Sequence, residues 1–270
     1  MRCAPLLAGV LLLHGCTARP AVTPQRIVSD NPCVDAILAD VAAPTQIGAV
    51  STYSHDPRAT SAPIGWAQHF PAMGGTAEEI IAAHPSLYLT GSPMMPATRA
   101  VADRAGIKVI ALPVANSVRE SEMQIVTVAR AIGREAAGAR LIGQIESAAR
   151  PHPPTHISAL IYQGGGLILG QGTLADDLLR RSGFRNAARL YGAKAWDVQP
   201  LERIIIAPPQ VILAPRTAHG EDARGLNQLR TALAHVGHTV RVADFDPQLL
   251  YCGAGSIIKA SARLAEIRQQ

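Results

Sequence analysis

The sequence predicts an α/β protein made of two similar lobes of mainly parallel sheet, joined by a bridging helix. Three observations support this fold class. Short aliphatic runs alternate with helical stretches after residue 24, one thirteen-residue segment occurs twice, and a long proline-free segment separates the two copies. Alternation of strands and helices is typical of parallel sheets, because two adjacent parallel strands need a crossover connection between them.

The predicted strands are short runs rich in Val, Ile and Leu. In chain order they are RIVSD, QIGAV, LYLTG, KVIALP, ISALIYQ, QVILAP and TVRVADF. Amphipathic helices are predicted between them, among them residues 76–84 and 97–105. Gly106 and Gly183 each follow a predicted helix, where a left-handed residue ends the helix before the next strand.

The repeated segment is AEEIIAAHPSLYL at 77–89 and LERIIIAPPQVIL at 201–213, with six of the thirteen positions identical. Each copy has the pattern of a short helix, a turn that contains proline, and a strand. A supersecondary unit that occurs twice in one chain predicts two lobes of similar structure.

Both predicted helices of the repeat begin with a start signal. Thr76 and Glu79 fit a capping box, and Pro200 suits the first position of a helix. Because Glu79 is engaged in the cap, Glu78 is left on the exposed first turn. Glu202 occupies the matching turn of the second copy.

The bridge is predicted from the segment 117–150, which contains no proline. It divides into one helix ending near Gly133 and a second helix of about 17 residues, which would span roughly 25 Å. That length is enough to connect two lobes, although a single domain would carry it as a long surface helix. The prolines of PHPPT at 151–155 then end the helix. The predicted organisation is an N-terminal lobe at 24–133, a bridging helix at 134–150 and a C-terminal lobe at 155–270.

The first residues have the layout of a secretory signal. Arg2 precedes an apolar stretch from Ala4 to Leu13, and small and polar residues follow it. We therefore expect residues 1–16 to be a signal peptide and the body of the protein to be periplasmic. The end of this segment resembles the bacterial lipobox, so Cys16 is a candidate for lipid modification, with ordinary cleavage as the alternative.

Two cysteines remain in the body of the protein, Cys33 and Cys252. An even pair in an oxidising compartment is consistent with a disulfide that joins the start of the fold to its end. The alternative is two buried thiols that never meet, because the sequence does not show whether their α-carbons lie within about 7 Å.

Composition argues against two classes of protein. Beyond the signal segment no apolar run approaches the roughly 20 residues of a membrane-spanning helix. The formal charge of +5 is compatible with nucleic-acid binding, but the arginines are scattered and no basic run alternates with aromatic residues. We therefore expect no nucleic acid as a partner.

The sequence contains no motif that indicates a catalytic or metal site. It lacks a GxSxG nucleophile motif, although an exported hydrolase acting in a cleft stays an alternative, because triads are recognised in space. His235 and His238 are three residues apart without a carboxylate or cysteine at ligand spacing, so we expect no metal site and assign His235 to a helix end. Binding of a free metal ion by several histidines is a less favoured alternative. No cofactor is expected.

Several segments together resemble one known family. They are RIVSDNPCVDAIL, IGAVSTYSHDP, GGTAEEIIAAHPSLYLTG, RAGIKVIALP and, after the bridging segment, TLADDLLRRSGFRNAA. Over about residues 24–268 the chain resembles the periplasmic substrate-binding proteins of ABC importers for iron-siderophores, haem and cobalamin. The resemblance implies two α/β lobes held by a single rigid helix, a ligand cleft between them, no catalysis, and a monomer that delivers its ligand to the subunits of an ABC permease.

The resemblance also gives a meaning to the matched glutamates. In that family one glutamate on each lobe docks against arginines of the permease, and by position these are Glu78 and Glu202. Carboxylate–arginine pairs at two separate lobe tips would fix the register of docking. The alternative is stabilisation of each helix dipole, worth about 0.3–1 kcal/mol for an acidic residue in a first turn.

Candidate ligand residues follow predicted strands, because ligands of open parallel sheets bind beyond the carboxyl ends of the strands. Flat aromatic rings there suit a large planar ligand, with core packing as the alternative for each ring. Trp196 lies six residues before Glu202, where the vitamin B12-binding branch of the family also carries a tryptophan. Cobalamin or a related corrinoid is therefore the favoured ligand, followed by a ferric siderophore and then by haem. The candidate residues are Pro32, Tyr53, Trp66, Tyr162, Gly165, Trp196, Arg216 and Tyr251.

Overall fold

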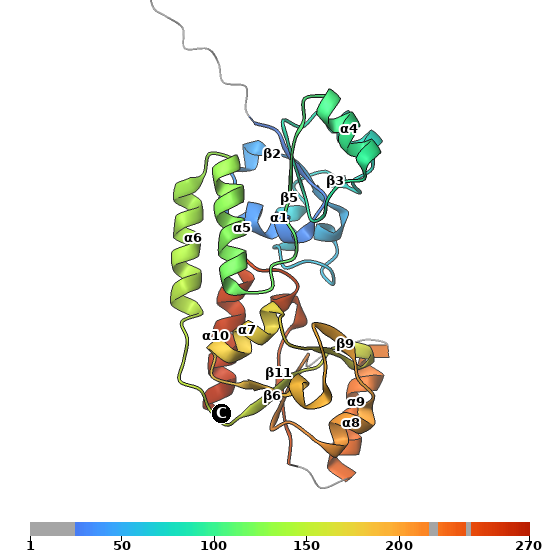
Figure 1. The fold of residues 1–270 in the computed structure, drawn as a ribbon, viewed down its shortest axis with the longest axis vertical. Coiled ribbons are helices and arrows are strands. Elements are labelled where there is room, and N and C mark those ends of the chain that lie inside the picture. The colour runs from blue at the N-terminus through green and yellow to red at the C-terminus, as the bar shows by residue number, and fades with distance from the viewer. Residues whose placement is uncertain (1–24, 216–220, 236–238) are drawn as a thin grey trace, which may run out of the picture.

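The computed structural model describes residues 25–215, 221–235 and 239–270. The predictions for residues 1–16, including Cys16, and for Arg216 lie outside these ranges. Figure 1 shows two sheets placed one above the other along the long axis of the molecule, each with its own helices. Within the described ranges, no helix combines the length and the apolar character that a membrane span needs.

The N-terminal sheet has five parallel strands in the order β3-β2-β1-β4-β5. Alternate residues of β1 face different layers: Ile27 packs in the core with α1 and α5, and Val28 packs on the opposite face with α3 and α4. The strands are β1 (Ile27–Ser29), β2 (Ile47–Ser51), β3 (Ala72–Met73), β4 (Leu87–Thr90) and β5 (Lys108–Ala111), and the helices are α1 (Pro32–Val41), α2 (Ile64–Ala67), α3 (Ala77–Ala83) and α4 (Pro96–Arg104).

The C-terminal sheet has four parallel strands in the order β11-β10-β6-β8, beside a separate two-stranded antiparallel sheet of β7 and β9. The strands are β6 (Ser158–Ile161), β7 (Leu167–Leu169), β8 (Arg185–Asn186), β9 (Trp196–Val198), β10 (Val211–Ala214) and β11 (Arg241–Asp244). The helices are α7 (Leu174–Arg181), α8 (Leu201–Ile206), α9 (Glu221–His235) and α10 (Ser256–Gln269).

The repeated segment forms equivalent elements in the two sheets, as the sequence predicts. α3 and β4 carry the first copy, and α8 and β10 carry the second. β4 lies between β1 and β5, and β10 lies between β6 and β11. Three of the six identical positions are buried in both copies: Ile80 and Ile204 on the helices, Pro85 and Pro209 in the turns, and Leu89 and Leu213 on the strands.

The bridging segment forms two antiparallel helices, α5 (Val118–Ala131) and α6 (Glu135–Ala148), separated at Gly133, whose φ is +67°. The chain passes from the N-terminal to the C-terminal sheet through α6. α6 is not alone on this flank, because α5 packs along it and α10 packs against its lower part (Figure 1).

One hydrophobic core connects the two sheets. It includes the inner faces of both sheets and residues of α1, α5, α6, α7 and α10. Ile125 of α5, Ile145 of α6 and Ile257 of α10 are fully buried in it. Interiors of this kind are close-packed and resist deformation, so the two halves are held in a fixed relation by packing as well as by the covalent connection.

Most local signals in the sequence match the structure. The Thr76 hydroxyl accepts from the amide of Glu79, whose carboxylate accepts from the amide of Thr76, which completes the capping box. Gly106 and Gly183 have φ values of +71° and +86°, as their position after helices predicts. The strands β3, β8 and β9 were not predicted, because two or three residues carry no alternating pattern.

The carboxyl group of Asp35 in α1 is buried, and its ionisation makes the stability of the fold depend on pH. Burial raises the pKa of Asp35 from 3.8 to about 7, although the Ser54 hydroxyl and the Ser51 amide donate hydrogen bonds to it. The folded state therefore holds this proton more tightly than the unfolded state, and the stabilisation is complete below pH 4 and is lost as the pH rises to 7.

We expect wild-type protein to lose about 2–3 kcal/mol of its free energy of unfolding from this group between pH 5 and pH 8. In the Asp35→Asn variant the side chain still accepts hydrogen bonds from Ser51 and Ser54 but does not ionise. Its free energy of unfolding therefore lacks this decrease between pH 5 and pH 8. Urea unfolding of both proteins at several pH values measures the difference. The same pH dependence in both proteins would contradict the assignment.

Candidate ligand-binding cleft

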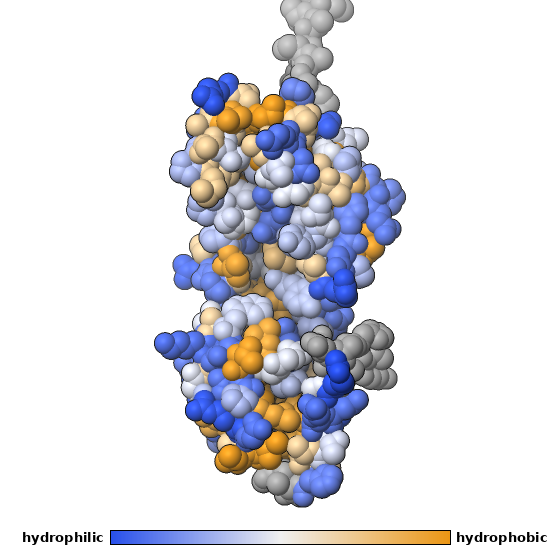
Figure 2. Space-filling view, turned by 90° about the vertical axis from the view of Figure 1, so that its right-hand side faces the viewer, coloured by the Kyte–Doolittle hydropathy of each residue, from blue (hydrophilic) through white to orange (hydrophobic). Residues whose placement is uncertain are grey.

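A cleft lies between the two halves of the molecule and is lined from both of them. Its enclosed space is about 50 Å³, and the cleft opens to solvent beyond it. Figure 2 shows the side of the molecule where it narrows between its two halves. The lining residues are Asn31, Cys33, Val34, Gly91, the segment 112–116 and Gln124 from the first half of the chain, and the segment 173–175, Trp196 and the segment 250–253 from the second.

The upper wall is built from loops at the carboxyl ends of parallel strands. Asn31 follows β1, Gly91 follows β4 and Leu112 follows β5. Asn31 is also the N-cap of α1, because its Oδ1 accepts from the amides of Cys33 and Val34 at 2.9 and 3.2 Å. A Cβ at Gly91 would lie 1.9 Å from the Asn31 amide nitrogen, so only glycine leaves room for this side chain.

The lower wall repeats the same arrangement. Thr173 is the N-cap of α7, and its hydroxyl accepts from the amide of Asp176 at 3.2 Å. α7 occupies in the C-terminal half the place that α1 occupies in the N-terminal half, between β6 and β8. Both helices therefore begin at the cleft, where their positive dipole ends favour electron-rich ligand atoms.

The chemistry of the lining is aromatic and amide-rich. Trp196, at the start of β9, is 50% exposed, and Tyr251 lies beside the disulfide. The side-chain amides come from Asn31, Asn116 and Gln124. Among the described lining residues none is charged, so this surface suits a large ligand that has flat or apolar faces and neutral polar groups.

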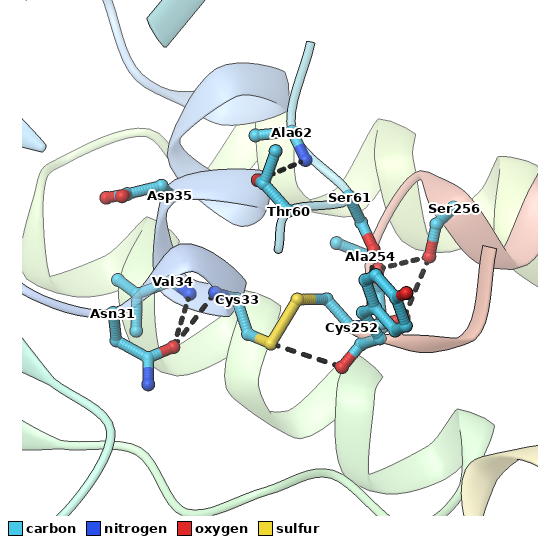
Figure 3. Close-up of a disulfide and its surroundings, with 12 residues drawn as sticks. Asn31, Cys33, Val34, Asp35, Thr60, Ser61, Ala62, Cys252, Ala254 and Ser256 are labelled. Carbon is cyan, nitrogen blue, oxygen red and sulfur yellow. Dashed lines mark hydrogen bonds between the residues drawn. A yellow bond between two sulfur atoms is a disulfide. The ribbon is translucent and has the colours of Figure 1, made fainter. Parts of the chain in front are cut away.

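A disulfide between Cys33 and Cys252 forms part of the cleft wall, which decides between the two alternatives that the sequence left open. Their α-carbons are 4.9 Å apart, and 219 positions separate them in the chain. Figure 3 shows how the bond joins the start of α1 to the segment that precedes α10.

The segment that carries Cys252 is also hydrogen-bonded to the N-terminal half of the chain. The Ser61 hydroxyl donates to the carbonyl of Gln248 at 2.6 Å and accepts from the amide of Cys252 at 3.2 Å. The amide of Gly255 donates to Asp40 of α1 at 3.1 Å. We call residues 248–255 the floor of the cleft. The side chains of Ser61 and Asp40, together with the disulfide, tie this floor to the N-terminal half and form a second connection between the two halves, in addition to the covalent chain through α6.

The predicted ligand residues divide into two groups. Trp196 and Tyr251 line the cleft, and Pro32 is the first residue of α1, between the lining residues Asn31 and Cys33. The structure therefore brings together candidates from the first and last parts of the sequence.

The other candidates lie elsewhere in the described structure. Tyr53 is 61% exposed on the turn after β2, and half-buried Trp66 packs edge-on against Phe70 at 5.0 Å. Tyr162 is 4% exposed in the C-terminal core, and together with Gly165 it borders a separate hollow between α8 and α9. None of these four is in the described lining of the cleft.

Sequence reasoning missed the polar residues of the cleft. Asn31 and Thr173 had a usable signal, since each is a typical N-cap residue directly before a predicted helix. Asn116 and Gln124 had none, because an amide in a loop or on a helix surface has no pattern of its own.

The matched glutamates occupy the predicted positions. Glu78 and Glu202 are both exposed on the first turns of α3 and α8. The neighbouring Glu79 is the capping residue, and hydrogen bonding to the amide of Thr76 lowers the pKa of its carboxyl group.

The histidines form no metal site in the described part of the chain, where no group of three potential metal ligands occurs. His235 ends α9, and its Nδ1 lies 2.9 Å from the carbonyl of Thr231, as expected for a residue at a helix C-terminus. His238 lies outside the described residues.

Comparison with solved structures shows a shared fold. The similar structures include the periplasmic heme-binding protein RhuT from Roseiflexus sp. RS-1 (20% identity, 91% of this chain and 97% of that one, TM-score 0.67). The heme-binding protein HutB of Vibrio cholerae is another (18%, 92% and 100%, TM-score 0.68). A heme-binding protein from Pseudomonas aeruginosa is a third (21%, 91% and 92%, TM-score 0.64).

Comparison with curated proteins finds no match. A family model described as periplasmic binding protein matches residues 27–229. This match spans most of the chain, from β1 through α5 and α6 to β10, and leaves out β11 and α10 at the end of the C-terminal half. The chain therefore belongs to the periplasmic binding protein family.

Proposed function

We propose that this protein is the solute-binding component of an ABC importer, which captures a large metal chelate in the cleft and delivers it to a permease. The observation that carries the proposal is the cleft itself, lined from both halves and open to solvent, with a half-exposed tryptophan on its wall. In this account residues 24–133 and 155–270 are the two lobes, 134–150 is the bridge, and the protein works as an exported monomer, with or without a lipid on Cys16.

A corrinoid is the ligand that the lining supports best. Cobalamin carries amide side arms around a flat macrocycle, and these can pair with the amides of Asn31, Asn116 and Gln124 while the ring lies against Trp196. Haem carries two carboxylates, and catecholate siderophores are anionic. Burying such charges without a cationic partner is costly, and the described lining contains no Lys or Arg.

Haem is the second candidate, for two reasons. Several proteins of similar fold are described as heme-binding, and one of them was solved with two hemes. Tyr251 also places a phenol group at the cleft, and tyrosine is a known axial ligand of haem iron. A ferric siderophore is the third candidate.

The test is a titration of the purified mature protein with cyanocobalamin, cobinamide, haemin and several ferric siderophores, followed by tryptophan fluorescence and confirmed by calorimetry. We expect saturable binding of one corrinoid per protein and no hydrolysis of generic esters. Saturation by haemin alone would replace the ligand but keep the function. If the folded protein binds none of these ligands, or if it hydrolyses esters, the proposal is contradicted.

Removal of the tryptophan ring should separate binding from stability. We expect Trp196→Ala to raise the Kd of the bound chelate roughly 10- to 100-fold, because a large aromatic contact is lost. Its half-exposed position predicts little change in melting temperature. Leu190→Ala is the control, since Leu190 is 63% exposed in the same half of the molecule but outside the cleft lining. Equal affinities of Trp196→Ala and wild type would remove Trp196 from the site.

Glu78 and Glu202 are proposed to dock the loaded protein on the permease. Two exposed carboxylates at matched positions of the repeat can pair with arginines and fix the register of the complex.

We expect the double variant Glu78→Lys and Glu202→Lys to lose transport while its Kd for the ligand stays unchanged. Glu135→Lys is the matched control, because Glu135 is also exposed in the first turn of a helix, α6, and its reversal reproduces the helix-dipole effect alone. Uptake into cells that express the permease measures the outcome. A loss of ligand affinity in the double variant, or equal transport defects in the control, would contradict docking.

A further inference from the structure

The Cys33–Cys252 disulfide lies in the wall of the cleft, where its redox state can change the affinity for a ligand. We propose that this bond is thermodynamically coupled to the ligand site: the oxidised form holds the cleft in its binding shape, and reduction by a dithiol weakens binding. The inference rests on the proposed function, because it concerns the affinity of the same cleft.

The first support is the position of the bond. Both cysteines line the cleft, one from each half of the chain. Cys33 lies in the first turn of α1, beside the N-cap Asn31, and Cys252 directly follows Tyr251. A ligand seated between the two halves therefore lies over the bond, and the bond sets the distance between two parts of the wall.

The second support is the state of the segment that follows Cys252. Ala254 has a φ of +58°, a left-handed conformation that an L-residue with a Cβ adopts at a cost. The amide of Ala254 donates to the buried Ser121 hydroxyl at 2.8 Å, and a Cβ at Gly253 would lie 2.2 Å from that hydroxyl. The segment is thus pressed against α5 in a conformation that its own backbone disfavours.

Such a segment needs anchors on both sides. Downstream, the amide of Gly255 donates to the carboxylate of Asp40. Upstream, the Ser61 hydroxyl accepts from the amide of Cys252, and the disulfide (Figure 3) holds the same residue. Loss of the covalent anchor releases the constraint nearest to Tyr251 and to the cleft wall. The main hydrophobic core that joins the two sheets contains neither cysteine; Cys252 lies in a small separate cluster with Ala36 and Ala62, against which Cys33 packs. We therefore expect the reduced protein to stay folded with an altered floor of the cleft.

The chemical step is ordinary thiol–disulfide exchange. Of the two cysteines, Cys33 is the more exposed, whereas Cys252 is only 3% exposed. A thiolate of the dithiol attacks the sulfur of Cys33, a mixed disulfide forms and the Cys252 sulfur leaves. The second thiol of the reagent then displaces Cys33, so the protein gains two thiols and the dithiol becomes a cyclic disulfide. Two electrons and two protons pass from reagent to protein.

Coupling of this kind is reciprocal. If oxidation strengthens ligand binding by a given factor, the ligand favours the oxidised form of the protein by the same factor. We expect a factor of about ten, in the range of typical coupling between sites. For a two-electron couple a tenfold change lowers the reduction potential by about 30 mV in the presence of saturating ligand.

The experiment compares oxidised protein with the double variant Cys33→Ser and Cys252→Ser. The probe is cyanocobalamin, whose upper axial site is already filled and therefore closed to thiols. The Kd is measured for both proteins, and the reduction potential of the wild-type bond is measured in dithiothreitol buffers with and without the probe. Ile80→Val, a mild core change on α3 away from the cleft, controls for a general loss of stability.

The coupling predicts an increase in Kd of about tenfold for the double variant, none for Ile80→Val, and a matching shift of the potential. Equal Kd values in folded wild type and double variant overturn it. So does a potential that saturating ligand leaves unchanged.

Hydrogen exchange of the Ala254 amide separates this inference from the proposed function. If cyanocobalamin does not bind, the assigned ligand fails, but the disulfide still predicts that this amide exchanges at least about ten times faster in the reduced protein. An equally slow amide in reduced and oxidised protein overturns the inference without reference to any ligand.

Discussion

The packing of α5, α6 and α10 between two sheets is the constraint on which the rest of the structure depends. Ile125, Ile145 and Ile257 are buried in one core that includes the inner faces of both sheets. Because this core is shared, the carboxyl ends of the strands in the two halves meet across a cleft whose width is set by packing. On the cleft side, the disulfide and the hydrogen bonds of Ser61 and Asp40 also hold the two halves in fixed positions relative to each other.

A cleft held in this way affects how a ligand is bound. In the proposed function we expect binding to require little free energy to organise the site, because packing fixes the distance between its walls. If the walls do not move, the ligands that bind are selected by the shape and chemistry of the lining residues. In its described part the lining offers a ligand side-chain amides and the aromatic rings of Trp196 and Tyr251.

Local and repeated features of the fold could be predicted from the sequence. The repeat predicted α3 with β4 and α8 with β10, because three of its six identical positions are buried at the same places of the helix, the turn and the strand in both halves. Caps and helix ends were also local: the Thr76 capping box and the left-handed Gly106 each depend on a few neighbouring residues.

Features that depend on contacts between distant residues could not be predicted in this way. The shared core is one, since the periodicity of α5 predicts that Ile125 is buried but not that its core extends to both sheets. The fit of Asn31 against Gly91 is another. For Cys33 and Cys252 the sequence left a disulfide and two separate thiols open, and only the structure decides for the disulfide. In the site, aromatic type alone did not separate Trp196, which lines the cleft, from Tyr162, which packs in the C-terminal core.

The central claim is that the shared core presents a ligand cleft already at its working width. Small-angle X-ray scattering of the protein, free and saturated with the chelate that it binds, tests this most directly. The account predicts scattering profiles that superimpose after correction for the ligand. A smaller radius of gyration in the complex, the sign of two lobes closing on their ligand, would contradict it.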